Sequence, residues 1–199
     1  MRGVRGTILR FLIAVMLVSG CRAQDKPVLS RSPLSEEQLS VYSGFLNRFS
    51  FLHFRNLSSV TVPFDFKGFP DSRLCLDGIE LENVAESLRT AHRFEPDTVV
   101  GRELKLVNPL EQLKLLQQRD ASSNIQKEKM TTEVQHSGDE LNFLVLSEIV
   151  FGKKHQFAVL KYLLVCGEHC ETGQTLVMEK KDGKWTASSR RPCAMLVGF

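Results

Sequence analysis

The C-terminal part of the chain, residues 141–199, carries the clearest pattern of hydrophobic and polar positions. Over residues 141–151 the odd positions are apolar except for Ser147, and over residues 157–166 both alternating sets are mostly apolar. A period of two is typical of a β-strand, and apolar residues on both faces favour a central strand. Two more strands are predicted at 174–180 and from Trp185 to the C-terminus.

The dipeptide Asp182-Gly183 separates these last two strands. A tight primed turn needs positive φ, which Gly and Asp tolerate, so the sequence predicts a two-residue hairpin in which Lys180 lies opposite Trp185. The last strand should be bent or bulged near Pro192, because proline donates no ladder hydrogen bond. Together the four strands predict an antiparallel meander.

Helical patterns occupy the preceding half of the chain. Residues 35–38 have a capping-box pattern, and apolar residues follow at helical spacing from Leu39 to Phe49. Asn83 with Glu86 predicts the start of a second helix that runs to residue 93, and Asn108 before Pro109 predicts a third. A strand is predicted at 59–66, and residues 119–140 are either an exposed helix extension or a mobile loop.

The predicted fold class is therefore α+β, with a C-terminal four-stranded antiparallel meander and two or three N-terminal helices packed on one face of it.

The N-terminus has the pattern of an export signal. Three arginines precede an apolar run at 11–18, and the run ends in Val18-Ser19-Gly20-Cys21. This string resembles the lipobox of bacterial lipoproteins, and the resemblance implies cleavage before Cys21 and lipid on its thiol. An ordinary signal peptide or an uncleaved anchor is the alternative. The predicted organisation is a lipoprotein signal peptide at 1–20, a lipidated tether at 21–34 and a single α+β domain at 35–199.

Removal of residues 1–20 would lower the formal net charge of the chain from +3 to zero. Those residues carry three arginines and no acids, so Lys and Arg together fall from 26 to 23, which equals the 23 acids. A formally neutral mature chain gives no electrostatic reason to expect a nucleic-acid partner. We expect membrane attachment through the N-terminal lipid, with the mature domain in the periplasm or at the cell surface. The outer membrane is preferred over the inner because Arg22, not Asp, follows the cysteine.

A second resemblance covers most of the mature chain. The segments VYSGFL, FEPDT, FLVLSEIVFGKKHQFAVL and LVMEKKDGKW look like parts of small secreted bacterial proteins of unknown function. The shared positions are turn glycines and a packing tryptophan. The resemblance therefore implies the α+β fold and transfers no catalytic residue.

Four cysteines follow the anchor cysteine: Cys75, Cys166, Cys170 and Cys193. An even number in an exported chain predicts two disulfides, with a bond across the Cys166 and Cys170 loop favoured and Cys75 with Cys193 as the remaining pair. The sequence permits three connectivities. A metal site using Glu168 and His169 with the two loop cysteines is the alternative, and no second pair in zinc spacing supports it.

No motif for a nucleophile, a paired-histidine zinc helix, a phosphate loop or a dinucleotide is present in the sequence. We therefore predict no catalytic, cofactor-binding or metal residues, and a cell-envelope module that binds a partner protein without catalysis. The alternative is a small-ligand-binding or hydrolytic domain with a pocket between the helices and the sheet.

Overall fold

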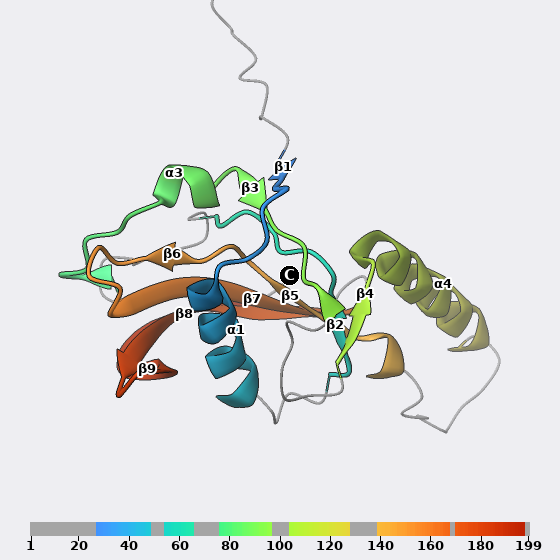
Figure 1. Cartoon of the computed structure of the whole chain (residues 1–199). Helices are drawn as coiled ribbons and strands as arrows, with labels where there is room; N and C mark the ends of the chain where they lie inside the picture. The colour runs from blue at the N-terminus through green and yellow to red at the C-terminus, as the bar shows by residue number, and fades with distance from the viewer. Residues whose placement is uncertain are drawn as a thin grey trace, which may run out of the picture.

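The structure is a computed structural model that describes residues 27–48, 54–65, 76–96, 104–127, 139–167 and 170–197. Figure 1 shows the order of the elements along the chain. The helices are α1 (Glu36–Arg48), α3 (Val84–Ser87), α4 (Pro109–Lys127) and the 3-10 turn η2 (Asp139–Leu141). The strands are β1 (Val28–Leu29), β2 (Asn56–Ser58), β3 (Thr90–Ala91), β4 (Lys105–Val107), β5 (Phe143–Leu146), β6 (Val150–Phe151), β7 (Phe157–Gly167), β8 (Cys170–Lys181) and β9 (Lys184–Val197).

Helices and a large sheet confirm the α+β class, but the predicted four-stranded meander is too small. The main sheet has seven strands in the order β4-β2-β5-β7-β8-β9, with β6 also paired to β7. The strands from β5 onward are antiparallel neighbours, whereas β2 pairs in parallel with both β4 and β5. β2 and β4 have three residues each, which is too short for a period of two to be recognised in the sequence.

The single strand predicted at 141–151 is interrupted at residues 147–149, between β5 and β6. At the break, the Ser147 hydroxyl accepts a hydrogen bond from the Lys161 amide at 2.8 Å, and the Ser147 amide donates to the Lys161 carbonyl at 2.9 Å. After the interruption, the odd-numbered side chains point to the face that the even-numbered side chains occupy before it. Leu144 and Leu146 therefore share one core cluster with Ile149 and Phe151.

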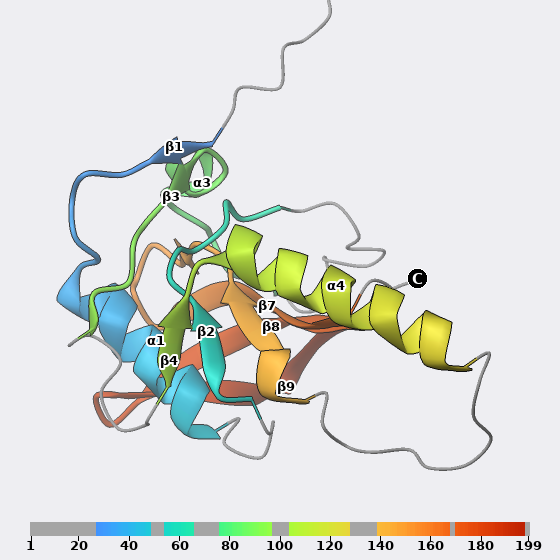
Figure 2. The same ribbon diagram turned by 90° about the vertical axis from the view of Figure 1, so that its right-hand side faces the viewer.

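The helices lie on both faces of the sheet, so the prediction of one helical face is wrong. α1 buries Tyr42 and Phe45 against the face that carries Leu144 and Leu160. Leu116 of α4 packs against Phe143, Val145 and Val165 on the opposite face. Figure 2 shows α1 and α4 on opposite sides of β2 and β4. Both faces of β5 are apolar, which is the sequence signature that this two-sided covering requires.

The hairpin register follows the prediction. Lys181 pairs with Lys184 and Lys180 with Trp185, and the turn residues Asp182 and Gly183 have φ values of 50° and 76°. The β8–β9 register shifts on either side of Leu176, which pairs with Pro192, so the predicted irregularity in the last strand is present.

The caps of two helices are also as predicted. Ser35 and Gln38 exchange hydrogen bonds at the start of α1, and the Asn108 side chain accepts from the Leu110 amide at 3.0 Å at the start of α4. α4 continues to residue 127, so the first part of the 119–140 segment is helical.

The helix predicted from Asn83 to residue 93 ends after one turn. Asn83 is in the left-handed region with φ 47° and makes no cap bond. Its side-chain NH₂ group instead donates to the Ile149 carbonyl at 3.2 Å, and its side-chain oxygen accepts from the Phe151 backbone amide at 3.1 Å. These two bonds hold β6 in place. The chain then extends into β3, which pairs in parallel with β1 inside the segment predicted as a tether. The strand predicted at 59–66 is wrong as well, since β2 ends at Ser58 and the described residues 59–65 form only isolated bridges, at Val60 and Val62.

Candidate functional site

A buried polar network fills the break between β5 and β6. Glu148 is 1% exposed. One of its oxygens accepts from the Thr61 hydroxyl and from the His92 amide, the latter at 2.9 Å, and the other lies 2.9 Å from His92 Nδ1. Because an ionised carboxylate only accepts hydrogen bonds, Nδ1 carries the proton of this contact. A neutral His92 therefore presents Nε2 as an acceptor.

The local backbone explains why these three residues meet. The Thr61 amide donates to the His92 carbonyl at 2.9 Å, and the Glu148 amide donates to the Val62 carbonyl at 2.7 Å. The strand break is thus bonded through its backbone to the segment at Val62, and that segment is bonded in turn to His92. Because His92 lies outside the strands, its backbone amide has no strand partner, and the Glu148 carboxylate serves as an acceptor for it.

Tyr42 of α1 closes the same region from the core side. Its hydroxyl donates to the Ser147 carbonyl at 2.8 Å, and the side chain is almost fully buried. Burial raises the pKa of Tyr42 well above its usual value, and the negative charge of Glu148 raises it further. The tyrosine therefore acts here as a neutral donor.

A pocket of about 280 Å³ opens beside this network. It lies between the chain that enters α1, the segment around α3 and the strand break. Hydroxyl, amide and carboxylate groups dominate its lining, with two apolar side chains, and the described lining includes neither lysine nor arginine. The lining residues are Ser32, Pro33, Ser35, Gln38, Asn83, Glu86, Ser87, Thr90, His92, Glu148 and Phe151.

A charged cluster lies next to this pocket, at the turn between β6 and β7. His155 contacts Glu37 of α1 at 2.6 Å and Glu82 of the segment before α3 at 2.5 Å. Lys180 of β8 adds a contact to Glu37 at 3.0 Å. These residues connect four segments of the chain: the β6–β7 turn, α1, the segment before α3, and β8.

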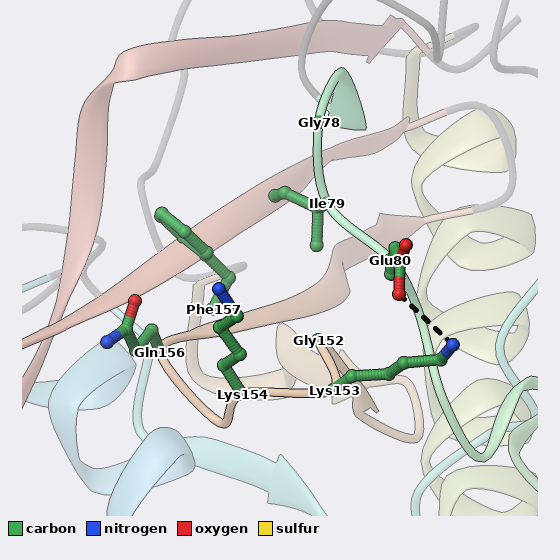
Figure 3. A pocket seen from close by; sticks show the side chains of 8 residues that line it. All are labelled: Gly78, Ile79, Glu80, Gly152, Lys153, Lys154, Gln156 and Phe157. Carbon is green, nitrogen blue, oxygen red and sulfur yellow. Dashed lines mark ion pairs between the residues drawn. The ribbon is translucent and has the colours of Figure 1, made fainter.

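A second pocket, of about 330 Å³, lies on the other side of that turn (Figure 3). Phe157 and Ile79 form its apolar part, and Lys154 and Gln156 stand at its edge. Lys153 points away to Glu80, with which it pairs at 3.1 Å, and both side chains are well exposed. An exposed ion pair at the edge of an apolar hollow selects a ligand weakly. The pocket beside Glu148 is therefore the stronger candidate.

Of the cysteines predicted to form disulfides, the structure describes the side chain of Cys166, which is disulfide-bonded. Cys170 and Cys193 are placed on β8 and β9 by their backbone alone, and Cys21 and Cys75 lie outside the described residues. The pairing therefore stays a prediction, as does lipid on Cys21. Glu168 and His169 of the alternative metal site also lie outside the described residues. Among the described residues, no three His, Cys, Asp or Glu side chains are arranged to hold a metal ion.

No family model, curated protein or solved structure matches the chain. The two resemblances noted in the sequence thus remain predictions. Among the described residues, no helix is long and apolar enough to cross a membrane.

Sequence reasoning did not identify His92 and Glu148 as partners. One signal was available in the sequence, since Glu148 interrupts the apolar run FLVLSEIVF. A carboxylate in the middle of a strand that is buried on both faces requires bonded partners. Nothing in the sequence indicates that Thr61 and His92 supply them.

Proposed function

We propose that this protein is a lipid-anchored cell-envelope protein whose folded part binds a small, uncharged, hydroxyl-rich or amide-rich ligand without catalysis. The observation that carries the proposal is the pocket beside Glu148, in which acceptors and hydroxyls converge from three separate segments. Convergent polar groups in a concave site are typical of small-molecule binding.

The lining also limits the class of ligand. Anions are usually held by arginine, lysine or a group of backbone amides, and the described lining offers neither cationic side chain. Carboxylates and a histidine Nε2 accept hydrogen bonds from hydroxyl or amide groups. The volume is near the lower end for small-molecule sites, which suits a ligand about the size of one sugar ring.

A panel of neutral sugars, acetamido sugars and polyols, with sugar phosphates as the charged comparison, tests the ligand class by saturation-transfer NMR. Ser32→Trp should fill the pocket mouth, because Ser32 is an exposed lining residue. Ser40→Trp, on an exposed position of α1 outside the lining, is the matched control.

We expect about a tenfold loss of affinity in Ser32→Trp, equivalent to about 1.4 kcal/mol, and no loss in the control. Binding of the sugar phosphates alone, equal affinities in both variants, or no binding across the panel would each contradict the proposed ligand class.

The anchor is a proposal that rests on the string Val18-Ser19-Gly20-Cys21. Cells given a palmitate analogue should incorporate label into the wild-type protein and not into Cys21→Ser. Label that persists in Cys21→Ser would exclude this thiol as the lipid attachment site.

Hydrolysis is the second candidate function, and the contact between His92 and Glu148 favours it. A histidine whose Nδ1 is held by a buried carboxylate is the arrangement of a general base. Thr61 is 1% exposed and does not line the pocket, so its hydroxyl is not placed to attack a ligand there. Turnover of chromogenic glycosides that is abolished by His92→Gln would favour this candidate over simple binding.

A further inference from the structure

Three segments of the chain meet at one imidazole ring. His155 lies in the turn between β6 and β7 with φ 50°, and its ring stacks on Phe151 with centroids 5.1 Å apart. Nδ1 is 2.6 Å from a Glu37 oxygen, and Nε2 is 2.5 Å from a Glu82 oxygen. Glu37 belongs to the first turn of α1, and Glu82 directly precedes Asn83.

This geometry fixes the protonation state of the ring. Ionised carboxylates accept hydrogen bonds and donate none, so each ring nitrogen must carry a hydrogen to hold its partner. A neutral imidazole has only one N–H. Two simultaneous contacts therefore require the imidazolium form of His155, with a charge-assisted bond on each side.

The two carboxylates belong to the two segments that form opposite walls of the pocket beside Glu148, although neither carboxylate lines it. Ser35 and Gln38 line it from the α1 side, with Glu37 between them in the sequence. Asn83, next to Glu82, lines it from the α3 side. At the far end of the same walls, the pairing of β1 with β3 joins them through the backbone.

We propose that His155 is a proton-dependent latch that joins the two walls of the pocket, so that loss of its proton loosens the wall formed by residues 82–92. The consequence for ligand binding rests on the proposed function, whereas the latch itself does not.

The surrounding charges indicate which contact is lost first. Lys180 holds Glu37 at 3.0 Å and also lies 5.4 Å above the Trp185 ring, so Glu37 keeps a cationic partner when His155 becomes neutral. Among the described residues, Glu82 has no other side-chain partner. Of the remaining charges near the ring, Lys153 pairs with Glu80, and Lys154 stands at the edge of the second pocket. The bond between Nε2 and Glu82 is therefore the contact expected to open.

The pKa shifts define the pH window. The hydrogen bond to Glu37 raises the pKa of His155 above its usual value, despite some opposing desolvation. Burial would raise the pKa of Glu37, but its bonds to Lys180 and His155 outweigh burial and lower it. The contribution of His155 is complete below its unfolded pKa of about 6.5 and is lost as the pH rises through the higher folded value. The contribution of Glu37 is lost only when the pH falls through its own lowered pKa. The latch is thus closed from mildly acidic to near-neutral pH and opens on the alkaline side.

The first test is a pH titration of the ¹⁵N-histidine-labelled protein without ligand, followed by long-range ¹H–¹⁵N NMR. We expect both His155 nitrogens to carry protons at pH 6, and Glu82→Gln to lower the pKa of His155. Glu80→Gln is the matched control, because it neutralises a nearby glutamate that pairs with Lys153 and does not touch the ring. A neutral His155 at pH 6, or a pKa unchanged in Glu82→Gln, would overturn the latch.

The second measurement is hydrogen exchange of residues 82–92 across the same pH range, corrected for the intrinsic pH dependence of exchange. Protection in the wild type should fall at the pKa of His155, and His155→Gln should show no such step. Protection that is independent of His155 would overturn the loosening of the wall. Since neither experiment uses a ligand, a failure of the sugar panel leaves both results interpretable. If a panel ligand binds, its affinity should fall over the same pH step in the wild type and not in His155→Gln.

Discussion

Replacing Glu148 with Gln should change the hydrogen-bonding polarity of the pocket while keeping the fold. The Gln oxygen can still accept from Thr61 and from the His92 amide, but an NH₂ group takes the place of the oxygen that faces His92 Nδ1. The imidazole must then accept at Nδ1, so its proton moves to Nε2. His92, which lines the pocket, would then carry a donor at Nε2 in place of an acceptor.

The energetic cost follows from the bonds in the network. Hydrogen bonds to a charged group contribute about 1.5–3 kcal/mol, against about 0.5–1.5 kcal/mol for neutral ones. Three contacts weaken, but the cost of burying a charge at a 1% exposed site also disappears. We therefore expect Glu148→Gln to lower the free energy of unfolding by about 1–2 kcal/mol. Glu148→Leu should lower it by about 3–5 kcal/mol, because all three contacts to the carboxylate are lost and His92 Nδ1 is left buried without its partner. The His92 amide keeps the Thr61 hydroxyl as an acceptor at 2.7 Å.

Urea unfolding followed by circular dichroism measures the free energy of unfolding of the wild type, Glu148→Gln and Glu148→Leu. The ¹⁵N chemical shifts of His92 show which ring nitrogen carries the proton. We expect the wild type to be the most stable, followed by Glu148→Gln and then by Glu148→Leu. The proton of His92 should move from Nδ1 to Nε2 in Glu148→Gln only. The reasoning fails if Leu is as stable as Gln, or if His92 keeps its proton on Nδ1 in Glu148→Gln. In the first case the carboxylate would not be satisfying buried donors, and in the second it would not be setting the tautomer.

Two further predictions concern Gly44, which packs against Trp185 of β9, and Gly183 in the turn before β9. A Cβ added at Gly44 would lie 2.4 Å from the Trp185 carbonyl oxygen, so Gly44→Ala should lose about 1–3 kcal/mol through overpacking against a gain of about 1 kcal/mol in helix propensity. We expect net destabilisation in urea melts, with the exposed Ser40→Ala as control, and a stability gain in Gly44→Ala would contradict the close approach. Gly183 has φ 76° with open space around it, so Gly183→Val should lose on the order of 1 kcal/mol or more through backbone strain alone. Gly183→Asn, which tolerates positive φ, should retain most of that stability in the same melts, and equal losses in both variants would argue against a φ effect.

The elements that the sequence determined are those whose information is local. The Asp182-Gly183 turn is specified by two adjacent residues with a positive-φ requirement, and its register follows from them. The cap at Ser35 is likewise complete within four residues, and the alternation of 157–166 is long enough to define a central strand. In each case the residues that select the structure are neighbours in the chain.

The candidate site was decided by tertiary structure. Glu148 is bonded to His92 and Thr61, which lie 56 and 87 positions before it in the sequence. No local pattern identifies those partners. The same holds for His155, which the sequence places in a polar turn although Glu37 and Glu82 come from two distant segments. Asn83 is a residue type that favours helix caps, yet its side chain bonds Ile149, just before β6, and Phe151 of β6 instead, because that tertiary contact is available in the folded chain. Periodicity reports burial, but it does not report which polar groups meet once the faces are buried.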